Sequence, residues 1–322
     1  MKAISAQDGE LVWSDVPEPQ CGPGQVKIQV HASAVNRADL LQAAGGYPPP
    51  PGASEILGLE CGGEVVELGE GVQRVAVGDQ VCALLAGGGY AERVVVPAGQ
   101  VLPVPRGLTT LEAAAIPEVF ATAFLNLYME AQLSMQEKVL IHAGASGVGT
   151  AAIQLLQATN NPCFVTVGSA DKVRQCVALG AAAGHDRHHG SFVEAVQDWA
   201  GESGVDVVLD PVGGQYLADN CAVLAVDGRL VLIGLMGGVK AEINLGLMMM
   251  KRLRLIASTL RSRPIGEKAA IMDRLQQEVW PKFEDGSIRP IIETRIKLAN
   301  ADEAHALVAT NETIGKVILT LD

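Results

Sequence analysis

The sequence has no apolar run long enough to cross a membrane. A membrane-spanning helix needs about 20 consecutive apolar residues, and no stretch of the chain approaches that length. The first residues, MKAISAQDGELVW, also lack the long apolar core of a secretion signal. We therefore expect a cytoplasmic protein that does not insert into a membrane.

Basic residues are scarce. The 322 residues include 24 Lys and Arg against 36 Asp and Glu, which gives a net charge of −12, and the basic residues form no block. Nucleic acids and anionic membranes attract basic surfaces, so we expect neither as a partner. The length allows two domains, and an apolar content of 48% is typical of a compact folded enzyme.

Paired cysteines are absent as well. The six cysteines lie far apart in the sequence and form no C-x-x-C pair. Structural zinc sites usually bring their ligands in such close pairs, so we expect no site of this kind. The thiols are expected to be reduced and mostly buried. They are Cys21, Cys61, Cys82, Cys163, Cys176 and Cys221.

Residues 1 to about 118 carry the patterns of short strands. Apolar and polar residues alternate over 26–32, which is the period of a half-buried strand. Glycine turns at 69–71 and 87–89 separate further short apolar runs. Many short strands joined by such turns favour a small antiparallel barrel. The Pro48–Pro51 run is expected to form a stiff surface loop.

From Leu111 the pattern becomes helical, with Pro117 as a break, and strands then alternate with helices. Such alternation is typical of a doubly wound parallel sheet, in which ligands bind at the carboxyl ends of the strands. After residue 260, a helix at Glu267–Trp280 precedes two apolar segments with a short helix between them. The strands expected in the alternating region are Val139–Ile141, Cys163–Val167, Val205–Leu209, Leu230–Ile233 and Leu253–Ala257.

One stretch, Lys138–Leu156, joins a strand to a helix through a glycine-rich turn and reads KVLIHAGASGVGTAAIQLL. This layout directs backbone N–H groups and the positive end of a helix dipole at a pyrophosphate. It departs from the G-x-G-x-x-G pattern because Ser146 occupies the second glycine position. An ordinary strand-to-helix turn is the alternative. The residues assigned here to a dinucleotide are Gly144, Ser146, Gly147 and Val148.

A second marker for a dinucleotide lies about 20 residues further on, where an acidic residue binds the ribose 2′-hydroxyl of NAD. In this chain the strand ends in FVTVGSADK, with Gly168 and Ser169 in place of the carboxylate. Lys172 would supply positive charge for a 2′-phosphate. Arg187 would add a second cation, or would be a solvated loop charge. We therefore predict NADP(H) in preference to NAD(H).

Three stretches of the chain carry a resemblance to a known family: HAGASGVG, SAVNRADLLQAAGGYPPPPGASEILGLECGGEVVELG and IGKVIL. They resemble the zinc-independent quinone oxidoreductases of the medium-chain dehydrogenase/reductase superfamily, and the resemblance covers nearly the whole chain. The resemblance implies an α/β fold with a GroES-like β-barrel catalytic domain, residues 1–118 and 261–322. It also implies a Rossmann doubly wound parallel-sheet domain that binds NADPH, residues 119–260. An active site in the cleft and a homodimer joined through the Rossmann domains are further implications.

The zinc-dependent alcohol dehydrogenases of the same superfamily provide a contrast. Their catalytic zinc ligands would fall at Asn36, at Leu59 and near Val119. Leu and Val cannot bind a metal, and Asn is a poor ligand. The sequence therefore predicts hydride transfer without a metal.

The resemblance assigns roles to several further positions. Asn36 would contact the acceptor carbonyl or the nicotinamide ribose, Tyr47 would face the substrate, and Thr122 would bind the nicotinamide amide. The structural alternatives for these three are a capped turn, a packed loop aromatic and a helix-facing threonine. The remaining cofactor positions are Leu235, Met236, Gly237, Ser258, Leu260 and, near a phosphate, Lys316.

The histidines are given no part in the reaction. His142, just before the glycine turn, is expected to be structural. A surface loop is expected to hold His185, His188 and His189.

The expected activity is NADPH-dependent reduction of a quinone, with hydride delivered by the nicotinamide. Two alternatives stay open: reduction of an enone, a 2-alkenal or an enoyl thioester on the same scaffold, and NADPH binding in a mainly non-catalytic role. The expected partner is a small-molecule quinone or conjugated carbonyl.

Overall fold

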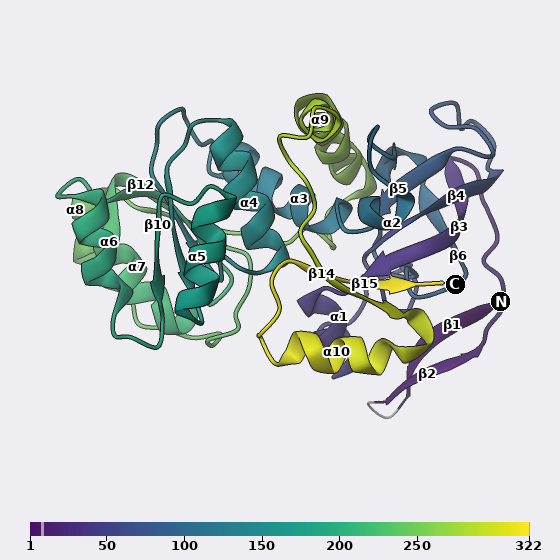
Figure 1. The fold of residues 1–322 in the computed structure, drawn as a ribbon, viewed down its shortest axis with the longest axis horizontal. Coiled ribbons are helices and arrows are strands. Elements are labelled where there is room, and N and C mark those ends of the chain that lie inside the picture. The colour runs from purple at the N-terminus through teal and green to yellow at the C-terminus, as the bar shows by residue number, and fades with distance from the viewer. Residues whose placement is uncertain (8–9, 322) are drawn as a thin grey trace. The chain divides into compact units, whose positions relative to one another are not determined.

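The computed structural model describes residues 1–7 and 10–321, and the chain forms two compact units. Unit 1 is Met1–Ala121 together with Leu260–Asp322, and unit 2 is Thr122–Thr259. Figure 1 shows how unit 1 is built from both ends of the chain, because the C-terminal segment, in yellow, returns beside the early strands, in purple.

Unit 1 is organised around a seven-stranded sheet. The strand order is β14-β15-β3-β4-β5-β7, and β6 also pairs with β3. The pairs are antiparallel except β14 with β15. The C-terminal strand β15 completes the sheet, since Ile318 lies opposite Ala34. The strands are β3 (Gln25–Ala34), β4 (Glu60–Leu68), β5 (Gln80–Leu84), β6 (Arg93–Pro97), β7 (Val101–Pro103), β14 (Ile292–Lys297) and β15 (Lys316–Thr320).

A separate hairpin and four α-helices complete unit 1, and a fifth helix begins in unit 1 at Pro117 and ends in unit 2 at Phe124. The hairpin pairs β1 (Lys2–Gln7) with β2 (Glu10–Asp15), and the sequence patterns did not predict it. The predicted alternation in β3 is confirmed, because Val26, Ile28 and Val30 lie in one buried cluster. The helices are α1 (Arg37–Ala43), α2 (Thr110–Ala113), α3 (Pro117–Phe124), α9 (Ile265–Glu284) and α10 (Ala301–Ala309).

Unit 2 contains the predicted parallel sheet. Its six strands follow the order β10-β9-β8-β11-β12-β13, and every neighbouring pair is parallel. The order reverses between β8 and β11, and this is the point of a doubly wound sheet at which ligands bind. The strands are β8 (Val139–His142), β9 (Cys163–Val167), β10 (Ala183–Asp186), β11 (Val205–Asp210), β12 (Leu224–Leu232) and β13 (Arg254–Ala257).

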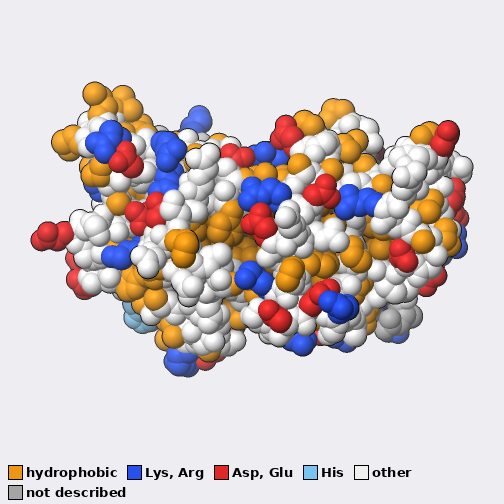
Figure 2. All heavy atoms as spheres, turned by 90° about the horizontal axis from the view of Figure 1, so that it is seen from above, with side chains coloured by type: hydrophobic (Ala, Val, Ile, Leu, Met, Phe, Trp, Pro, Cys, Tyr) orange, Lys and Arg blue, Asp and Glu red, His pale blue; other side chains and the backbone are white. Residues whose placement is uncertain are grey.

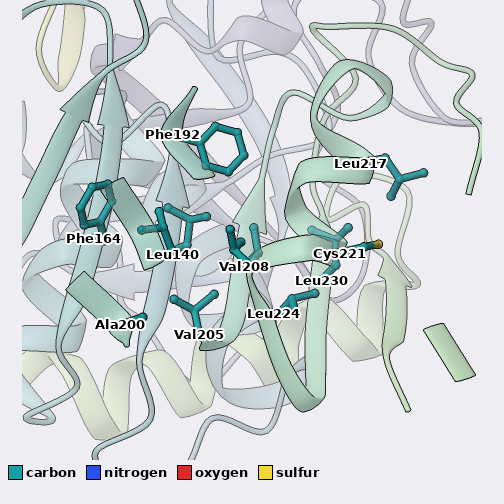
Figure 3. Close-up of a cluster of buried hydrophobic side chains, with 12 residues drawn as sticks. Leu140, Phe164, Phe192, Ala200, Val205, Val208, Leu217, Cys221, Leu224 and Leu230 are labelled. Atoms are coloured by element: carbon teal, nitrogen blue, oxygen red, sulfur yellow. The ribbon is translucent and has the colours of Figure 1, made fainter. Parts of the chain in front are cut away.

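Helices cover both faces of this sheet (Figure 1). α6 and α7 pack on one face through the buried cluster in Figure 3, where Phe192 and Leu217 meet side chains of the strands, among them Leu140 and Val208. α4 and α5 lie on the other face (Figure 1). The helices are α4 (Gly147–Ala158), α5 (Ala170–Leu179), α6 (Phe192–Ala200), α7 (Leu217–Val223), α8 (Leu245–Lys251) and the π-helix η2 (Leu125–Glu130).

Unit 2 differs from the sequence-based expectations in the start of β12, which is Leu224 rather than Leu230, in the start of one helix and in the place of one histidine. The helix after β9 begins at Ala170 rather than near Lys172, because Ser169 caps it. The expectation that His185 lies in a loop is wrong, because His185 belongs to the edge strand β10. That strand is short, reads AGHD and is only half-buried, so it lacks the apolar run by which the other strands were found. Over the described ranges, no helix combines the length and apolarity needed to span a membrane.

Candidate active site

Two glycines of the turn between β8 and α4 have no room for a side chain. A Cβ added to Gly144 would lie 2.6 Å from Val165 Cβ, and one added to Gly149 would lie 2.4 Å from the carbonyl oxygen of Gly144. Separations this short are repulsive, so both positions require glycine. The helix therefore starts very close to the strands, as a phosphate-binding turn requires.

Ser146 has a definite task at the second glycine position. It is the N-cap of α4, and its Oγ accepts a hydrogen bond from the Gly149 N–H at 3.1 Å. The first N–H groups of a helix have no partner within the helix. Since the cap satisfies Gly149, the N–H groups of Gly147 and Val148 are the ones left for an anion at the positive end of the α4 dipole.

At the carboxyl end of β9, an arginine lies against a glycine. A Cβ added to Gly168 would lie 3.3 Å from Nη2 of Arg187, and the Arg187 side chain is exposed. Lys172 is only 7% exposed. The charge of Lys172 acts on a buried neighbour, the Cys176 thiol: burial raises the pKa of that thiol to about 11, and the Lys172 charge opposes the rise. Of the two predicted cations, Arg187 is therefore the one that solvent and a phosphate can reach beside Gly168.

The loop after β12 is tied to the loop after β11. The N–H groups of Met236 and Gly237 donate to the carbonyls of Pro211 and Val212, at 3.1 and 2.7 Å. The side chains of Leu235 and Met236 are exposed. The structure thus holds Leu235, Met236 and Gly237 at the carboxyl end of the sheet.

A buried polar chain braces the same end of the sheet. His142 Nδ1 lies 2.8 Å from Thr166 Oγ1, and its Nε2 lies 2.7 Å from Asn220 Oδ1. Asn220 donates in turn to Asp210 at 2.9 Å, and Asp210 accepts the N–H groups of the next loop. Burial lowers the pKa of His142 to about 4. His142 is therefore neutral at pH 7, and its contacts agree with the structural role expected for it.

Two polar side-chain atoms in unit 2 are buried without a hydrogen-bond partner in the part of the chain that the structure describes. They are Ser258 Oγ, just after β13, and Asn126 Oδ1, in the π-helix. Leaving such atoms unpaired costs free energy, so a bound polar group is a natural partner for them. Thr122 is half-buried, and its carbonyl accepts a hydrogen bond from the Asn126 amide at 2.8 Å.

In unit 1, Asn36 belongs to a buried ionic cluster. Its Nδ2 donates to Glu60 Oε1 at 2.9 Å and to the Ala34 carbonyl at 3.2 Å, while its Oδ1 accepts from Lys316 Nζ at 2.6 Å. Both N–H groups of the amide are thus engaged within unit 1. Asp39 accepts the Asn36 backbone N–H at 2.8 Å, so the turn that begins α1 holds Asn36 in place.

The contacts of Lys316 do not agree with a role at the cofactor phosphate. Its ammonium group lies 2.8 Å from Glu60 Oε1, 2.7 Å from the Val35 carbonyl and 2.6 Å from Asn36 Oδ1. An ammonium group has three N–H donors, and these three acceptors use all of them. Lys316 has no donor left for a phosphate and serves instead to neutralise Glu60.

Tyr47 lies beside Arg261. The Arg261 guanidinium stands 5.3 Å from the centre of the Tyr47 ring and donates to the carbonyls of Tyr47 and Ala86 and to Gln42. Burial raises the pKa of the Tyr47 hydroxyl, and the charge of Glu118 raises it further. Leu260, the residue before Arg261 in the sequence, is buried.

Glu60 and Glu118 are polar residues of this site that the sequence patterns did not single out. Glu60 is fully buried, and its Oε2 accepts the backbone N–H of Glu118 at 2.9 Å. In the sequence, Glu60 follows Leu59 and Glu118 precedes Val119, the two positions that align with zinc ligands of the alcohol dehydrogenases. This adjacency could have pointed to both glutamates.

Leu59 and Val119 are themselves buried apolar side chains. The described ranges contain no group of three or more His, Cys, Asp or Glu side chains placed to hold a metal ion.

Two family descriptions match the chain. "Alcohol dehydrogenase GroES-like domain" matches residues 22–106, and "Zinc-binding dehydrogenase" matches residues 179–319. With the strand order of unit 2, these matches confirm the expected combination of a GroES-like domain and a Rossmann parallel sheet.

Three similar proteins illustrate the relationship. Quinone oxidoreductase-like protein 2 of Rattus norvegicus is 30% identical over 97% of this chain and 89% of its own length. A phenolphthiocerol/phthiocerol polyketide synthase subunit of Mycobacterium tuberculosis is 29% identical over 98% of this chain, which spans 14% of that protein. A mycobacterial protein solved in complex with NADPH is 29% identical, with a TM-score of 0.88 and full coverage of both chains. The chain therefore belongs to the medium-chain dehydrogenase/reductase superfamily, as an oxidoreductase related to the quinone oxidoreductase-like proteins.

Proposed function

We propose that this chain is an NADPH-dependent quinone oxidoreductase that works without a metal. The observation that carries the proposal is the tight turn from β8 into α4, in which Gly144 and Gly149 have no room for side chains. This turn leaves the N–H groups of Gly147 and Val148 for a pyrophosphate. The near-full-length similarity to a rat quinone oxidoreductase-like protein supports the choice of acceptor.

The described residues fit a nicotinamide dinucleotide. The pyrophosphate would lie at Gly144, Ser146, Gly147 and Val148, and the loop with Leu235, Met236 and Gly237 would border the cofactor at the same end of the sheet. Ser258 brings a buried hydroxyl that lacks a partner among the described residues, and Thr122 completes the contacts assigned within unit 2. The cofactor supplies the hydride when it is bound.

Preference for NADPH is supported by the end of β9. Gly168 and Ser169 stand where an NAD-binding protein carries a carboxylate, and the exposed guanidinium of Arg187 lies against Gly168. Arginine binds phosphate through paired hydrogen bonds. The similarity to a mycobacterial protein solved with NADPH agrees with this preference. The contribution first assigned to Lys172 passes in this proposal mainly to Arg187.

Independence from metal is supported by the residues at the three contrast positions. Leu59 and Val119 offer no donor atom, and the Asn36 oxygen already accepts from the Lys316 ammonium at 2.6 Å. A cation at that oxygen would repel a metal ion. Tyr47 would instead position the acceptor, with its ring available to stack on a flat quinone. Asn36 would line the acceptor site without donating a hydrogen bond to it, because both N–H groups of its amide are engaged.

Reduction of an enone or enoyl thioester is the second candidate, and one comparison favours it. The chain matches a 14% segment of a polyketide synthase over nearly its whole length, at 29% identity. A panel of 1,4-benzoquinone, 1,2-naphthoquinone and crotonyl thioester with NADPH separates the two candidates. Turnover of quinones supports the proposal, whereas turnover of the thioester alone replaces it with the second candidate.

Binding without turnover is the third possibility. Fluorescence titration with NADPH and NADH measures binding independently of the acceptor. Tight NADPH binding with no acceptor reduced would make the protein a cofactor-binding module, and failure to bind either nucleotide would overturn all three readings.

We also propose that two copies pair through unit 2. β13 is the edge strand of the sheet, and it and α8 expose apolar side chains such as Leu255, Met249 and Met250. Figure 2 shows hydrophobic side chains gathered at the left end of the view, where α8 lies. An apolar surface beside an open strand edge favours pairing with the same edge of a second copy.

Sedimentation at equilibrium tests this pairing. Leu255→Lys should give monomers, and Val177→Lys, which alters an exposed apolar side chain on α5, should leave the dimer intact. A wild-type monomer, or a Leu255→Lys variant that stays dimeric, would overturn this interface.

A further inference from the structure

The backbone of Glu118 contacts an ion pair that is already complete. Glu60 is fully buried, and its Oε1 lies 2.8 Å from the Lys316 ammonium and 2.9 Å from the Asn36 amide nitrogen. Its Oε2 accepts the backbone N–H of Glu118 at 2.9 Å. The charge of Glu60 is therefore neutralised by Lys316, and Glu118 is an additional acid in the cluster.

Glu118 itself is not neutralised. Its Oε2 is buried and has no hydrogen-bond partner among the described residues. The nearby cations are engaged elsewhere: Lys316 with Glu60, Arg261 with Gln42 and two carbonyls, and Lys268 with the Arg261 carbonyl. An ionised carboxylate with a buried unpaired oxygen is unfavourable, and a protonated carboxyl group removes most of that cost.

The surroundings of Glu118 also favour the protonated form of its carboxyl group. Burial raises its pKa to about 8, and the negative charge of Glu60 acts in the same direction. The positive charges of Lys316 and Arg261 oppose this rise in the pKa of Glu118, and the negative charge of Asp39 adds to it. The charged and titratable groups that act on Glu118 or respond to it are Asp39 on α1, Tyr47, Glu60 on β4, Arg261, Lys268 on α9 and Lys316 on β15.

We propose that Glu118 is the acid that protonates the reduced acceptor, a catalytic role that rests on the proposed quinone reduction. Glu60 joins Glu118 to Asn36, because its Oε2 accepts the Glu118 backbone N–H and its Oε1 accepts from the Asn36 amide, both at 2.9 Å. The electrostatics agree with this placement, because the Glu118 charge raises the pKa of Tyr47, the residue proposed to hold the acceptor. An acceptor held at Tyr47 is therefore near a protonated carboxyl group in the same unit of the structure.

The proton balance of this step is simple. The quinone gains two electrons and one hydrogen as hydride from NADPH, and the reduced ring carries a negative oxygen. The O–H bond of Glu118 breaks, a new O–H bond forms on that oxygen, and the products are a hydroquinone, NADP⁺ and the Glu118 carboxylate. Solvent then returns a proton to Glu118, so each turnover consumes one proton.

The first test needs no turnover. Infrared spectra of the full chain at pH 7 should show the C=O stretch of a protonated carboxyl group, and Glu118→Gln should lack it. Glu194→Gln alters an exposed acid on α6 and should keep the band. If the wild-type and Glu118→Gln spectra are the same in this region, Glu118 is ionised and the proposal is overturned.

The second test measures kcat against pH with NADPH and 1,2-naphthoquinone. In the wild type, kcat should fall as pH rises through about 8, because the acid is lost. Positioned general acids contribute about 10²-fold or more, so Glu118→Gln should be slower by about that factor and should lack the pH limb.

The outcomes separate the two proposals. If the wild type reduces quinones and Glu118→Gln keeps its rate and pH profile, the inference on Glu118 is wrong and the quinone reductase proposal stands. If the wild type binds NADPH and reduces no quinone, both fall. NADPH affinity should be equal in wild type and Glu118→Gln, and a large loss of affinity would show that Glu118 acts through the cofactor instead.

Discussion

Lys316 and Glu60 form a buried ion pair with a separation of 2.8 Å, and their side chains are 4% and 0% exposed. The lysine is on β15, near the C-terminus, and the glutamate is on β4. The pair therefore ties the C-terminal strand to the first half of the chain.

Lys316→Met should strongly destabilise unit 1. Removing one partner of a buried pair leaves the other charge without compensation, which costs about 3–5 kcal/mol. Urea unfolding of the full chain measures this loss. Lys2→Ala breaks the exposed pair with Asp15 and should change stability little. Equal small losses in the two variants would contradict the importance given to the buried pair.

The sequence predicted the unit 2 sheet better than the unit 1 cluster, and the reason is physical. Strands β8, β9 and β11 are almost entirely buried and consist mainly of apolar residues, so a local pattern was sufficient to find them. The polar and half-buried edge strand β10 had no such pattern. The unit 1 cluster depends on β15 pairing with β3, and no local pattern reports a pairing between segments this distant. Glu60 and Glu118 were missed for that reason, and Lys316 was placed at a phosphate.

Arg187→Ala should weaken NADPH binding by about tenfold or more and leave NADH binding nearly unchanged. The guanidinium lies against Gly168 and is exposed, and a hydrogen bond to a charged group contributes about 1.5–3 kcal/mol. Lys172→Ala is the matched variant and should have the smaller effect, because Lys172 is buried. Fluorescence titration of each variant with NADPH and with NADH gives four affinities, each of which is compared with that of the wild type. If Lys172→Ala loses more NADPH affinity, relative to NADH affinity, than Arg187→Ala does, then Lys172 rather than Arg187 binds the 2′-phosphate.

Gly149→Ala should abolish NADPH binding. It should also destabilise unit 2, and by more than Gly144→Ala does. The new methyl group at position 149 would meet the Gly144 carbonyl at 2.4 Å, whereas at position 144 it would meet the side chain of Val165. A backbone carbonyl in a tight turn moves less easily than a side chain. Gly266→Ala, near the start of α9, has open space around it and should be neutral or slightly stabilising. Thermal unfolding and NADPH titration of the three variants check the order.

The stability of Glu118→Gln relative to wild type should depend on pH. The pKa of Glu118 is about 8 in the folded protein, against 4.5 as the ordinary value. Between these pH values the native state holds the proton more tightly than the unfolded chain does. The contribution of Glu118 is therefore fully present below pH 4.5 and is lost as pH rises through about 8. Glutamine does not titrate, so the variant keeps its stability over this range. The difference in unfolding free energy should move in favour of Glu118→Gln from pH 5 to pH 8 by an amount on the order of a few kcal/mol. Glu194→Gln should show no such trend in parallel urea titrations, and a pH-independent difference for Glu118→Gln would mean that Glu118 is ionised throughout.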